Sequence, residues 1–259
     1  MRITILGSGT SQGVPIIGCD CHVCTSTNPK DKRLRTSIMI SHKGENFVID
    51  SGPDFRQQML RENVKTLSGI IFTHEHKDHI AGLDDVRAFN YLEKRDMPIY
   101  CTEQVEKALR NEFHYVFAEN KYPGVPSLDL HRISKKDPFK VADDLILTPI
   151  EVNHYRMPVL GFRMGDFTYI TDAKTVAEEE KEKIRGSKIL IVNALRTKEH
   201  ISHFNLKEAL AFIEEMNPER AYLTHISHLF ARHDEIEAML PENVSVVWDG
   251  MRFEVKNEE

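Results

Sequence analysis

The sequence predicts an α/β protein built as a four-layer αββα sandwich, with two sheets packed face to face and helices on both outer surfaces. Strand-like apolar runs are followed by helical periodicity in the first half of the chain, and the second half repeats that order. No Pro-, Gly- or Ser-rich linker and no internal sequence repeat interrupts the 259 residues. We therefore expect one domain spanning residues 1–259.

Short runs rich in Ile, Val and Phe, bounded by Gly, Pro or Asp, predict the strands of the first half. They cover residues 2–6, 37–42, 46–50, 69–73, 99–101 and about 128–133. The second and third of these strands form a hairpin around Lys43-Gly44-Glu45. Helices are expected over residues 54–62, 83–95 and 103–117. Because Pro123, Pro126 and Pro138 interrupt it, the segment 119–138 is expected to be a loop or lid around its short strand.

The second half continues with further strands and helices of the same kinds. Strands are expected over residues 145–152, 160–164, 167–171, 188–192 and 220–224, with a strand pair over 244–255. Helices are expected over residues 175–184, 205–216 and 232–240.

Charge and hydrophobicity exclude some classes of function. The net charge is 34 − 40 = −6, which argues against a general nucleic-acid binder, since such proteins carry a basic stripe. The N-terminal apolar run is too short for a signal peptide, and no span is long enough to cross a bilayer. We expect a soluble, cytoplasmic protein that needs no membrane. The sequence does not decide the oligomeric state, and a homodimer stays open.

Four metal-ligand side chains fall within six residues after the apolar strand 69–73: His74, His76, Asp78 and His79. Imidazole suits zinc, manganese and iron, and carboxylate suits harder divalent ions. Two such pairs can serve two adjacent cations, which together hold the attacking and leaving oxygens of a displacement. The alternative is a charged surface loop, which this density of ligands disfavours.

A second cluster contains three cysteines, Cys19, Cys21 and Cys24. Three thiolates and one imidazole make a closed structural zinc site, and in a cytosolic chain such a cluster favours metal over disulfides. The alternative is three free thiols in a loop. His22 is the nearest candidate for the fourth ligand, although its place between two of the cysteines is sterically awkward.

The His74–His79 motif makes this chain resemble the metallo-β-lactamase superfamily from end to end. The resemblance implies further site residues at strand ends: Asp50, His154, Asp172 and His225. One metal would take His74, His76 and His154, the other Asp78, His79 and His225, with Asp172 bridging them and Asp50 orienting a ligand. Taken alone, a His after a strand is usually a surface or core residue, and Asp172 could be an ordinary helix N-cap.

Within the superfamily, the segment 7–15 with its Gly-Ser-Gly turn, the cysteine cluster and the segment 82–87 resemble PhnP-type phosphodiesterases. Those enzymes hydrolyse phosphoribosyl 1,2-cyclic phosphate and hold a structural zinc with three cysteines and a His. The resemblance selects His228 as the fourth zinc ligand and His203, rather than His200, as the substrate-side His. The alternative for His203 is a helix-capping role.

The implied function is a phosphodiesterase acting on a small cyclic or nucleotide-like ester, by attack of a metal-bridging hydroxide on phosphorus. His203 and Asp78 are the candidates for proton transfer. The implied cofactors are two divalent active-site metals (manganese or zinc, with iron open) and one structural zinc. The alternatives are a tRNA 3′-processing endonuclease, a thioester or lactam hydrolase, and a non-catalytic metal-binding module. Four basic residues either grip a second phosphate or ribose or are surface charges: Arg33, Arg35, Arg87 and Lys174.

Overall fold

The computed structural model describes residues 1–255 and contains two β-sheets. The first has the strand order β15 (Arg252–Glu254), β1 (Arg2–Gly7), β2 (Ser37–His42), β3 (Glu45–Ile49), β4 (Gly69–Ile71), β5 (Met97–Cys101) and β6 (Leu128–Arg132). The second has the order β11 (Thr175–Val176), β8 (Leu145–His154), β9 (Met157–Met164), β10 (Phe167–Tyr169), β12 (Ile189–Asn193), β13 (Arg220–Thr224) and β14 (Val244–Val246), and β7 (Phe139–Ala142) pairs with β8.

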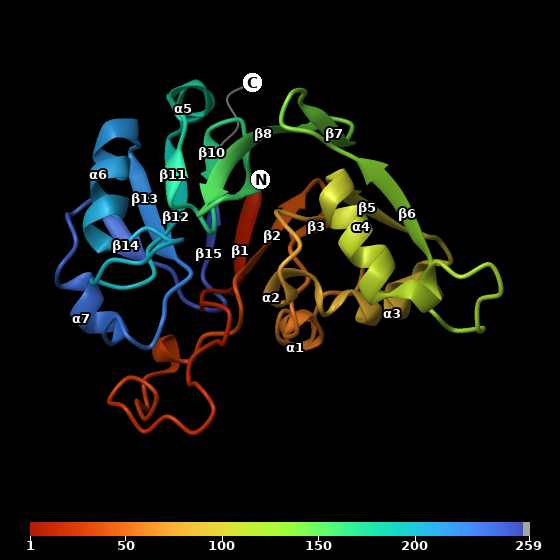
Figure 1. The fold of residues 1–259 in the computed structure, drawn as a ribbon, viewed down its shortest axis with the longest axis horizontal. Helices are drawn as coiled ribbons and strands as arrows, with labels where there is room; N and C mark the ends of the chain where they lie inside the picture. Colours follow the sequence, from red (N-terminus) through yellow and green to blue (C-terminus); the bar gives the residue numbers. More distant parts are fainter. Residues whose placement is uncertain (256–259) are drawn as a thin grey trace.

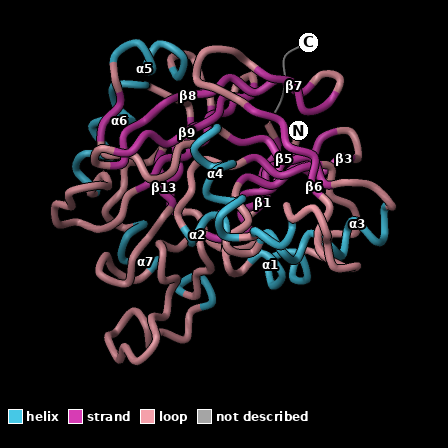
Figure 2. Tube along the Cα trace, turned by 45° about the vertical axis from the view of Figure 1, so that its right-hand side comes forward, coloured by secondary structure: helices cyan, strands magenta, loops and turns pink. Residues whose placement is uncertain are grey.

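Helices lie outside the sheets, so the strands occupy the middle of the molecule (Figures 1 and 2). The α-helices are α1 (Phe55–Arg61), α2 (Lys77–Ile80), α3 (Arg87–Glu93), α4 (Glu103–Glu112), α5 (Glu178–Ile184), α6 (Leu206–Met216) and α7 (His233–Glu237). Short 3-10 helices cover Pro29–Asp31, Leu83–Val86 and His114–Val116. The expected αββα architecture is confirmed.

The apolar core has three parts, in agreement with this layering. One cluster packs α5 and α6 on the second sheet, and another packs α1, α3 and α4 on the first. The third draws fully buried residues from both sheets, such as Ile5 and Phe47 from the first and Phe162 and Tyr169 from the second. Burial of these inward faces is what joins the sheets, since each strand alternates its side chains between two surfaces.

Parallel pairing brings the carboxyl ends of neighbouring strands together within each sheet. β3 pairs with β4 through Ile49↔Ile71 in the first sheet, and β12 pairs with β13 through Asn193↔Thr224 in the second. The residues that follow these strands therefore lie close together in each sheet. The expected site residues at these strand ends are Asp50 and His74 in the first sheet and His225 in the second.

Some expected elements differ in the structure. The segment 244–255 contains two strands, but they belong to different sheets: β14 pairs in parallel with β13, and β15 pairs antiparallel with β1. The prediction of a strand pair there is wrong, because β15 finds its partner at the far end of the chain through Ile3↔Phe253. Strand β7 was not expected. The helix expected over 103–117 ends at Glu112 and continues as a 3-10 turn.

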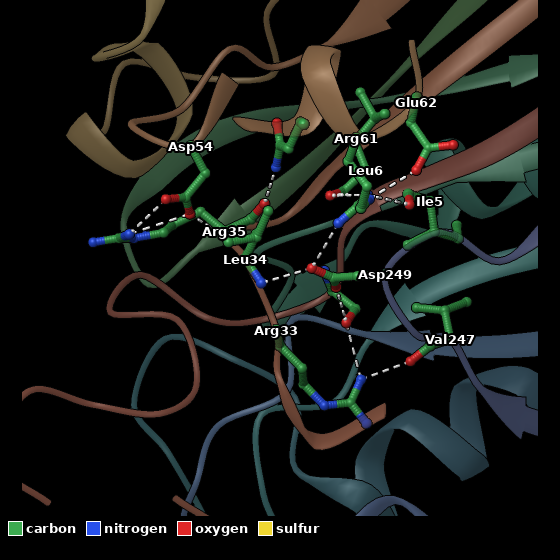
Figure 3. Close-up of polar contacts among 12 residues, drawn as sticks. Ile5, Leu6, Arg33, Leu34, Arg35, Asp54, Arg61, Glu62, Val247 and Asp249 are labelled. Atoms are coloured by element: carbon green, nitrogen blue, oxygen red, sulfur yellow. Dashed lines mark hydrogen bonds and ion pairs between the residues drawn. The ribbon is translucent and has the colours of Figure 1, made fainter. Parts of the chain in front are cut away.

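A buried polar network fastens the long β1–β2 connection, which projects beside α7 (Figure 1), to the C-terminal part of the chain (Figure 3). Arg33 is 3% exposed, and it donates to Ser8 Oγ at 3.0 Å and to the Val247 carbonyl at 2.6 Å. It also lies 3.3 Å from Nδ1 of His233. Asp249 accepts hydrogen bonds from the Ser8 amide and hydroxyl. These contacts attach Ser8 of the Gly-Ser-Gly turn to Arg33 and Asp249.

Within residues 1–255, no helix is both long enough and apolar enough to cross a membrane.

Candidate metal centre

The segment His74–His79 leaves the end of β4 and turns into α2. His76 is the N-cap of α2 with extended backbone, so His74 and His76 precede the helix while Asp78 and His79 lie on its first turn. A Cβ atom at Gly52 would lie 2.0 Å from the backbone oxygen of Asp78. Only glycine lets the chain after β3 pack this closely against α2.

A chain of hydrogen bonds orients two of these histidines from behind. Asp50 is fully buried, and its Oδ2 lies 2.7 Å from His79 Nδ1. The same oxygen accepts from Thr73 Oγ1 at 2.8 Å, and Thr73 Oγ1 in turn lies 2.9 Å from His74 Nδ1. With both Nδ1 atoms engaged in this way, Nε2 of His74 and of His79 is left for the opposite side.

Asp172 lies between the two groups of ligands. It follows β10, and its carboxylate oxygens lie 3.3 Å from His79 Nε2 and 3.2 Å from His225 Nε2. Asn193 holds the adjacent Ala173 by bonds to both its amide and its carbonyl. Asp50, Asp172 and His225 all have positive φ, between 57° and 65°. Backbone of this kind is uncommon for residues other than glycine and tends to occur at functional sites.

His76, His154 and His203 complete one side of the cluster. The ring centroids of His74 and His76 are 4.7 Å apart, and those of His76 and His154 are 5.2 Å apart. His154 ends β8, and its Nδ1 donates to the Ser202 carbonyl at 2.8 Å. The His203 ring lies 4.4 Å from that of His154 and 4.7 Å from that of His225. The structure thus brings together all eight histidine and aspartate residues expected at the centre: His74, His76, Asp78, His79, His154, Asp172, His203 and His225.

The donor atoms of this cluster fit divalent cations. Nε2 of His74 and His79, and both ring nitrogens of His225, are buried without a hydrogen-bond partner among the described residues. A buried polar atom without a partner is costly. Three sets of side chains present ligand atoms within 4.8 Å of one another: His74, His79 and Asp172; Asp78, His79 and His225; and His154, Asp172 and His203.

Three of the cluster histidines are held in the neutral form that binds metal. His79 is the exception, because the carboxylates of Asp50, Asp78 and Asp172 outweigh the effect of its burial and raise its pKa well above the usual value. Burial, together with neighbouring histidines, lowers the pKa of His74 well below its usual range and the pKa of His203 to about 2, and burial lowers the pKa of His225. These rings are neutral at pH 7, the form that ligates metal. Burial works against the charge of Asp172, but His225 and His79 outweigh it and hold the pKa of that carboxyl well below its usual value.

The cysteine cluster forms a second group with His228, on the loop after β13 that also carries His225. The three Sγ atoms lie 3.3, 3.5 and 3.6 Å from His228 Nδ1, for Cys19, Cys21 and Cys24 respectively. Tetrahedral zinc with Zn–S of about 2.3 Å and Zn–N of about 2.0 Å places sulfur and nitrogen roughly 3.5 Å apart. His22 points elsewhere, toward Glu235 at 3.6 Å. The geometry therefore matches a Cys3His site.

The four basic residues considered for substrate binding have other partners. Arg33 belongs to the buried network described above, so the expectation that it is either a surface charge or a phosphate contact is wrong. Arg35 pairs with Asp54 at 2.9 Å, Arg87 with Asp84 at 3.3 Å and Lys174 with Glu208 at 2.7 Å.

Thr73 is the contact that sequence reasoning missed. The Thr73 hydroxyl links Asp50, which follows β3, to His74, which follows β4. The parallel pairing of these two strands is the signal that could have identified this contact.

Comparison with known proteins agrees with this geometry. Residues 45–226 match the family model of the beta-lactamase superfamily domain, which covers most of the chain and includes all eight residues of the His/Asp cluster. The chain belongs to the metallo-β-lactamase superfamily.

One solved structure places it within the superfamily, and a second shares its fold. The crystal structure of a new diphosphatase from the PhnP family superimposes with a TM-score of 0.91 and 37% identity, over 99% of this chain and 98% of that one. This is a PhnP-type metallo-β-lactamase protein. Zn2+-bound PqqB from Methylobacterium extorquens shares the fold, with a TM-score of 0.82 and 19% identity over 98% and 100% of the two chains.

A sequence relative carries a different name. The octanoyltransferase of Porphyromonas gingivalis is 40% identical over 253 residues, which is 97% of this chain and 51% of that protein. The chain thus spans about half the length of this relative. The name of the longer protein does not by itself assign octanoyl transfer to the half that is matched.

Proposed function

We propose that this metallo-β-lactamase-fold protein is a metal-dependent phosphodiesterase acting on a small cyclic or nucleotide-like ester. The observation that carries the proposal is the convergence of buried imidazole nitrogens, which make no hydrogen bond among the described residues, with the carboxylates of Asp78 and Asp172 at 3.2–3.3 Å. The likeness to a diphosphatase of the PhnP family supports phosphorus chemistry over thioester or lactam hydrolysis. The proposal takes the chain as one catalytic domain, since its central core draws on both sheets.

Seven residues would hold two divalent cations: His74, His76 and His154 the first, Asp78, His79 and His225 the second, and Asp172 both. Manganese or zinc suits these ligands, and iron is also compatible. When bound, such a pair lowers the pKa of water and polarises a phosphoryl oxygen. The Cys3His site would hold one zinc and stabilise the β1–β2 connection.

Hydrogen bonds from neighbouring residues orient the proposed histidine ligands. Asp50 and Thr73 fix the rings of His79 and His74. The Nε2 atoms of both rings are therefore held in the orientation that metal binding requires. The Ser202 carbonyl does the same for His154.

Two residues are proposed to act on the reacting groups, one by donating a hydrogen bond and the other by accepting a proton. His203 is buried and neutral, so its ring N–H would donate a hydrogen bond that stabilises negative charge on a phosphate oxygen or on the departing alkoxide. Asp78 is half-buried beside His79, where it could ligate a cation and accept a proton from the attacking water.

The test is hydrolysis of bis-p-nitrophenyl phosphate by manganese-loaded protein, with His76→Ala as the variant. We expect turnover by the natural protein and none by the variant, because the first set of ligands then lacks a member. His114→Ala removes an exposed histidine from a 3-10 turn and serves as the matched control. Full activity in His76→Ala would contradict the proposal. Parallel assays with a thioester, a lactam and a pre-tRNA separate the alternatives.

A further inference from the structure

A pocket of about 630 Å3 opens beside the proposed metal ligands His76 and His154. One wall is the hairpin turn between β8 and β9, and the other is the loop at residues 201–202. The hydrogen bond from His154 Nδ1 to the Ser202 carbonyl joins these walls. The volume lies within the range of small-ligand sites. Anything that occupies this pocket lies next to the reacting centre.

The hairpin turn that forms the first wall contains a tyrosine, Tyr155, with an unusual backbone conformation. His154 pairs with Met157, so Tyr155 and Arg156 make a two-residue hairpin loop, and Tyr155 has φ of +58°. Such positions are normally occupied by Gly, Asn or Asp, because a bulky side chain is unfavourable there. An unfavourable backbone retained next to a reacting centre points to a use for the side chain.

The two walls present apolar surface to solvent. Tyr155 is 51% exposed and Ile201 is 65% exposed, and both line the pocket. An aromatic ring on one side and an aliphatic side chain on the other suit a flat ring, since stacking on Tyr is tolerant of the identity of a base.

The charge of the pocket is also distinctive. Arg156 lies with its guanidinium carbon 5.1 Å from the centre of the Tyr155 ring, and no carboxylate is among the described residues that line this pocket. By contrast, the neighbouring pocket, which shares Gln104, is lined by three glutamates and two lysines: Glu75, Glu103, Glu151, Lys107 and Lys135. In a chain of net charge −6, a carboxylate-free pocket with a guanidinium favours an anionic ligand.

We propose that this pocket binds the nucleotide portion of the substrate, with its base between Tyr155 and Ile201 and a second phosphate on Arg156. The inference rests on the proposed phosphodiesterase function and narrows its substrate to an ester that carries a flat base and a further anionic group. Tyr155 and Arg156 are thus specificity-determining residues, whereas the metal ligands carry the chemistry.

The test is isothermal titration of metal-loaded protein with three probes: adenosine 3′,5′-bisphosphate, adenosine 5′-monophosphate and inorganic phosphate. Tyr155→Asn keeps a residue that tolerates positive φ, and it should weaken both nucleotides about tenfold by removing one stacking contact. Arg156→Ala should weaken the bisphosphate by a similar factor and the monophosphate less. Neither variant should change the affinity for inorganic phosphate.

Two matched controls are available at exposed positions away from the pocket. Tyr122→Asn removes a tyrosine that is 80% exposed, and Arg220→Ala removes an exposed arginine at the start of β13, at the far end of that strand from His225. Both should bind all three probes as the natural protein does. Thermal unfolding of Tyr155→Asn should be unchanged or raised, which excludes a merely structural role for the tyrosine.

Hydrolysis of bis-p-nitrophenyl phosphate and nucleotide binding can each fail separately. If the natural protein hydrolyses bis-p-nitrophenyl phosphate but Tyr155→Asn and Arg156→Ala bind both nucleotides normally, only the assignment of the pocket is overturned. If the natural protein hydrolyses no phosphodiester, the proposed function itself falls, and the nucleotide site falls with it.

Discussion

Asp50 Oδ2 lies 2.7 Å from Nδ1 of His79, and both side chains are buried to at least 99%. The same carboxylate reaches His74 through the Thr73 hydroxyl. One buried carboxyl group therefore orients a histidine in each of the two proposed ligand sets.

Replacing Asp50 by Asn should weaken metal binding while leaving the ligands themselves intact. The carboxylate accepts from His79 and the Thr73 hydroxyl through Oδ2 and from the Thr73 amide through Oδ1. The Asn side chain must place its NH2 group against one of these donors, so we expect the affinity for manganese to fall about 10- to 100-fold. Calorimetric titration of metal-free protein with Mn2+ measures the effect. Asp143→Asn, at a fully exposed aspartate, is the control. Equal affinities would show that Asp50 does not act on the ligands.

Replacing Cys21 by Ser should remove one zinc per chain and much of the stability, because a structural site contributes its binding energy to folding. Whatever protein remains folded should retain its active-site metals. Elemental analysis and thermal unfolding measure the two effects. Cys101→Ser removes a thiol that is buried in the first sheet, and it should leave the zinc content unchanged. Retention of zinc by Cys21→Ser would exclude that thiol as a ligand.

Replacing Arg33 by Met should destabilise the fold without touching the metal ligands. Ser8 Oγ, the Val247 carbonyl and His233 would each lose a buried partner. We expect a loss of about 3 kcal/mol in the free energy of unfolding, measured with urea. Arg220→Met, at an exposed arginine, should stay within about 0.5 kcal/mol of the natural protein. A similar small change for Arg33→Met would mean that the network is dispensable.

His233 should make stability depend on pH. Burial, followed by the charge of Arg33, lowers the pKa of His233 to about 4 from its ordinary value of 6.5. Between these pH values His233 binds a proton in the unfolded chain but not in the folded chain. The free energy of unfolding therefore falls as the pH drops from 6.5 to 4. The full difference corresponds to about 3 kcal/mol, and partial hydration reduces our expectation to about 1–2 kcal/mol.

The measurement is urea unfolding of the natural protein and of His233→Gln at several pH values. The glutamine oxygen can still accept from Arg33, so the variant keeps the contact but loses the titration. Its stability should therefore fall less between pH 6.5 and 4. Parallel curves for the two proteins would rule out His233 as the source of the slope.

A feature of this structure can be predicted from the sequence when the residues that form it lie close together in the chain. The ligands from His74 to His79 are contiguous and follow a recognisable strand, so the residues themselves point to metal. His154, Asp172 and His225 are single residues far apart in the chain, and only the resemblance to a family singled them out.

Other features depend on partners that no local pattern reveals. Arg33 resembles a surface charge until the fold brings to it Val247 and His233, which lie 214 and 200 residues away in the chain. Strand β15 is too short to identify a partner, which proves to be β1. Tyr155 occupies a turn position without the Gly or Asn that marks such turns, so its conformation could only be seen in the structure.

The left-handed backbone at Asp50, Asp172 and His225 restricts how this centre can change. A residue that replaces one of these three must first adopt positive φ, whatever its ability to bind metal. Asn, Asp, His and Gly do so at low cost, whereas β-branched or bulky residues are destabilised. Redesign toward a different metal is therefore freer at His76 and His154, whose backbones are extended, than at the bridging position. The inherited geometry of the strand ends, as much as selection for activity, would keep the same few amino acids at these places.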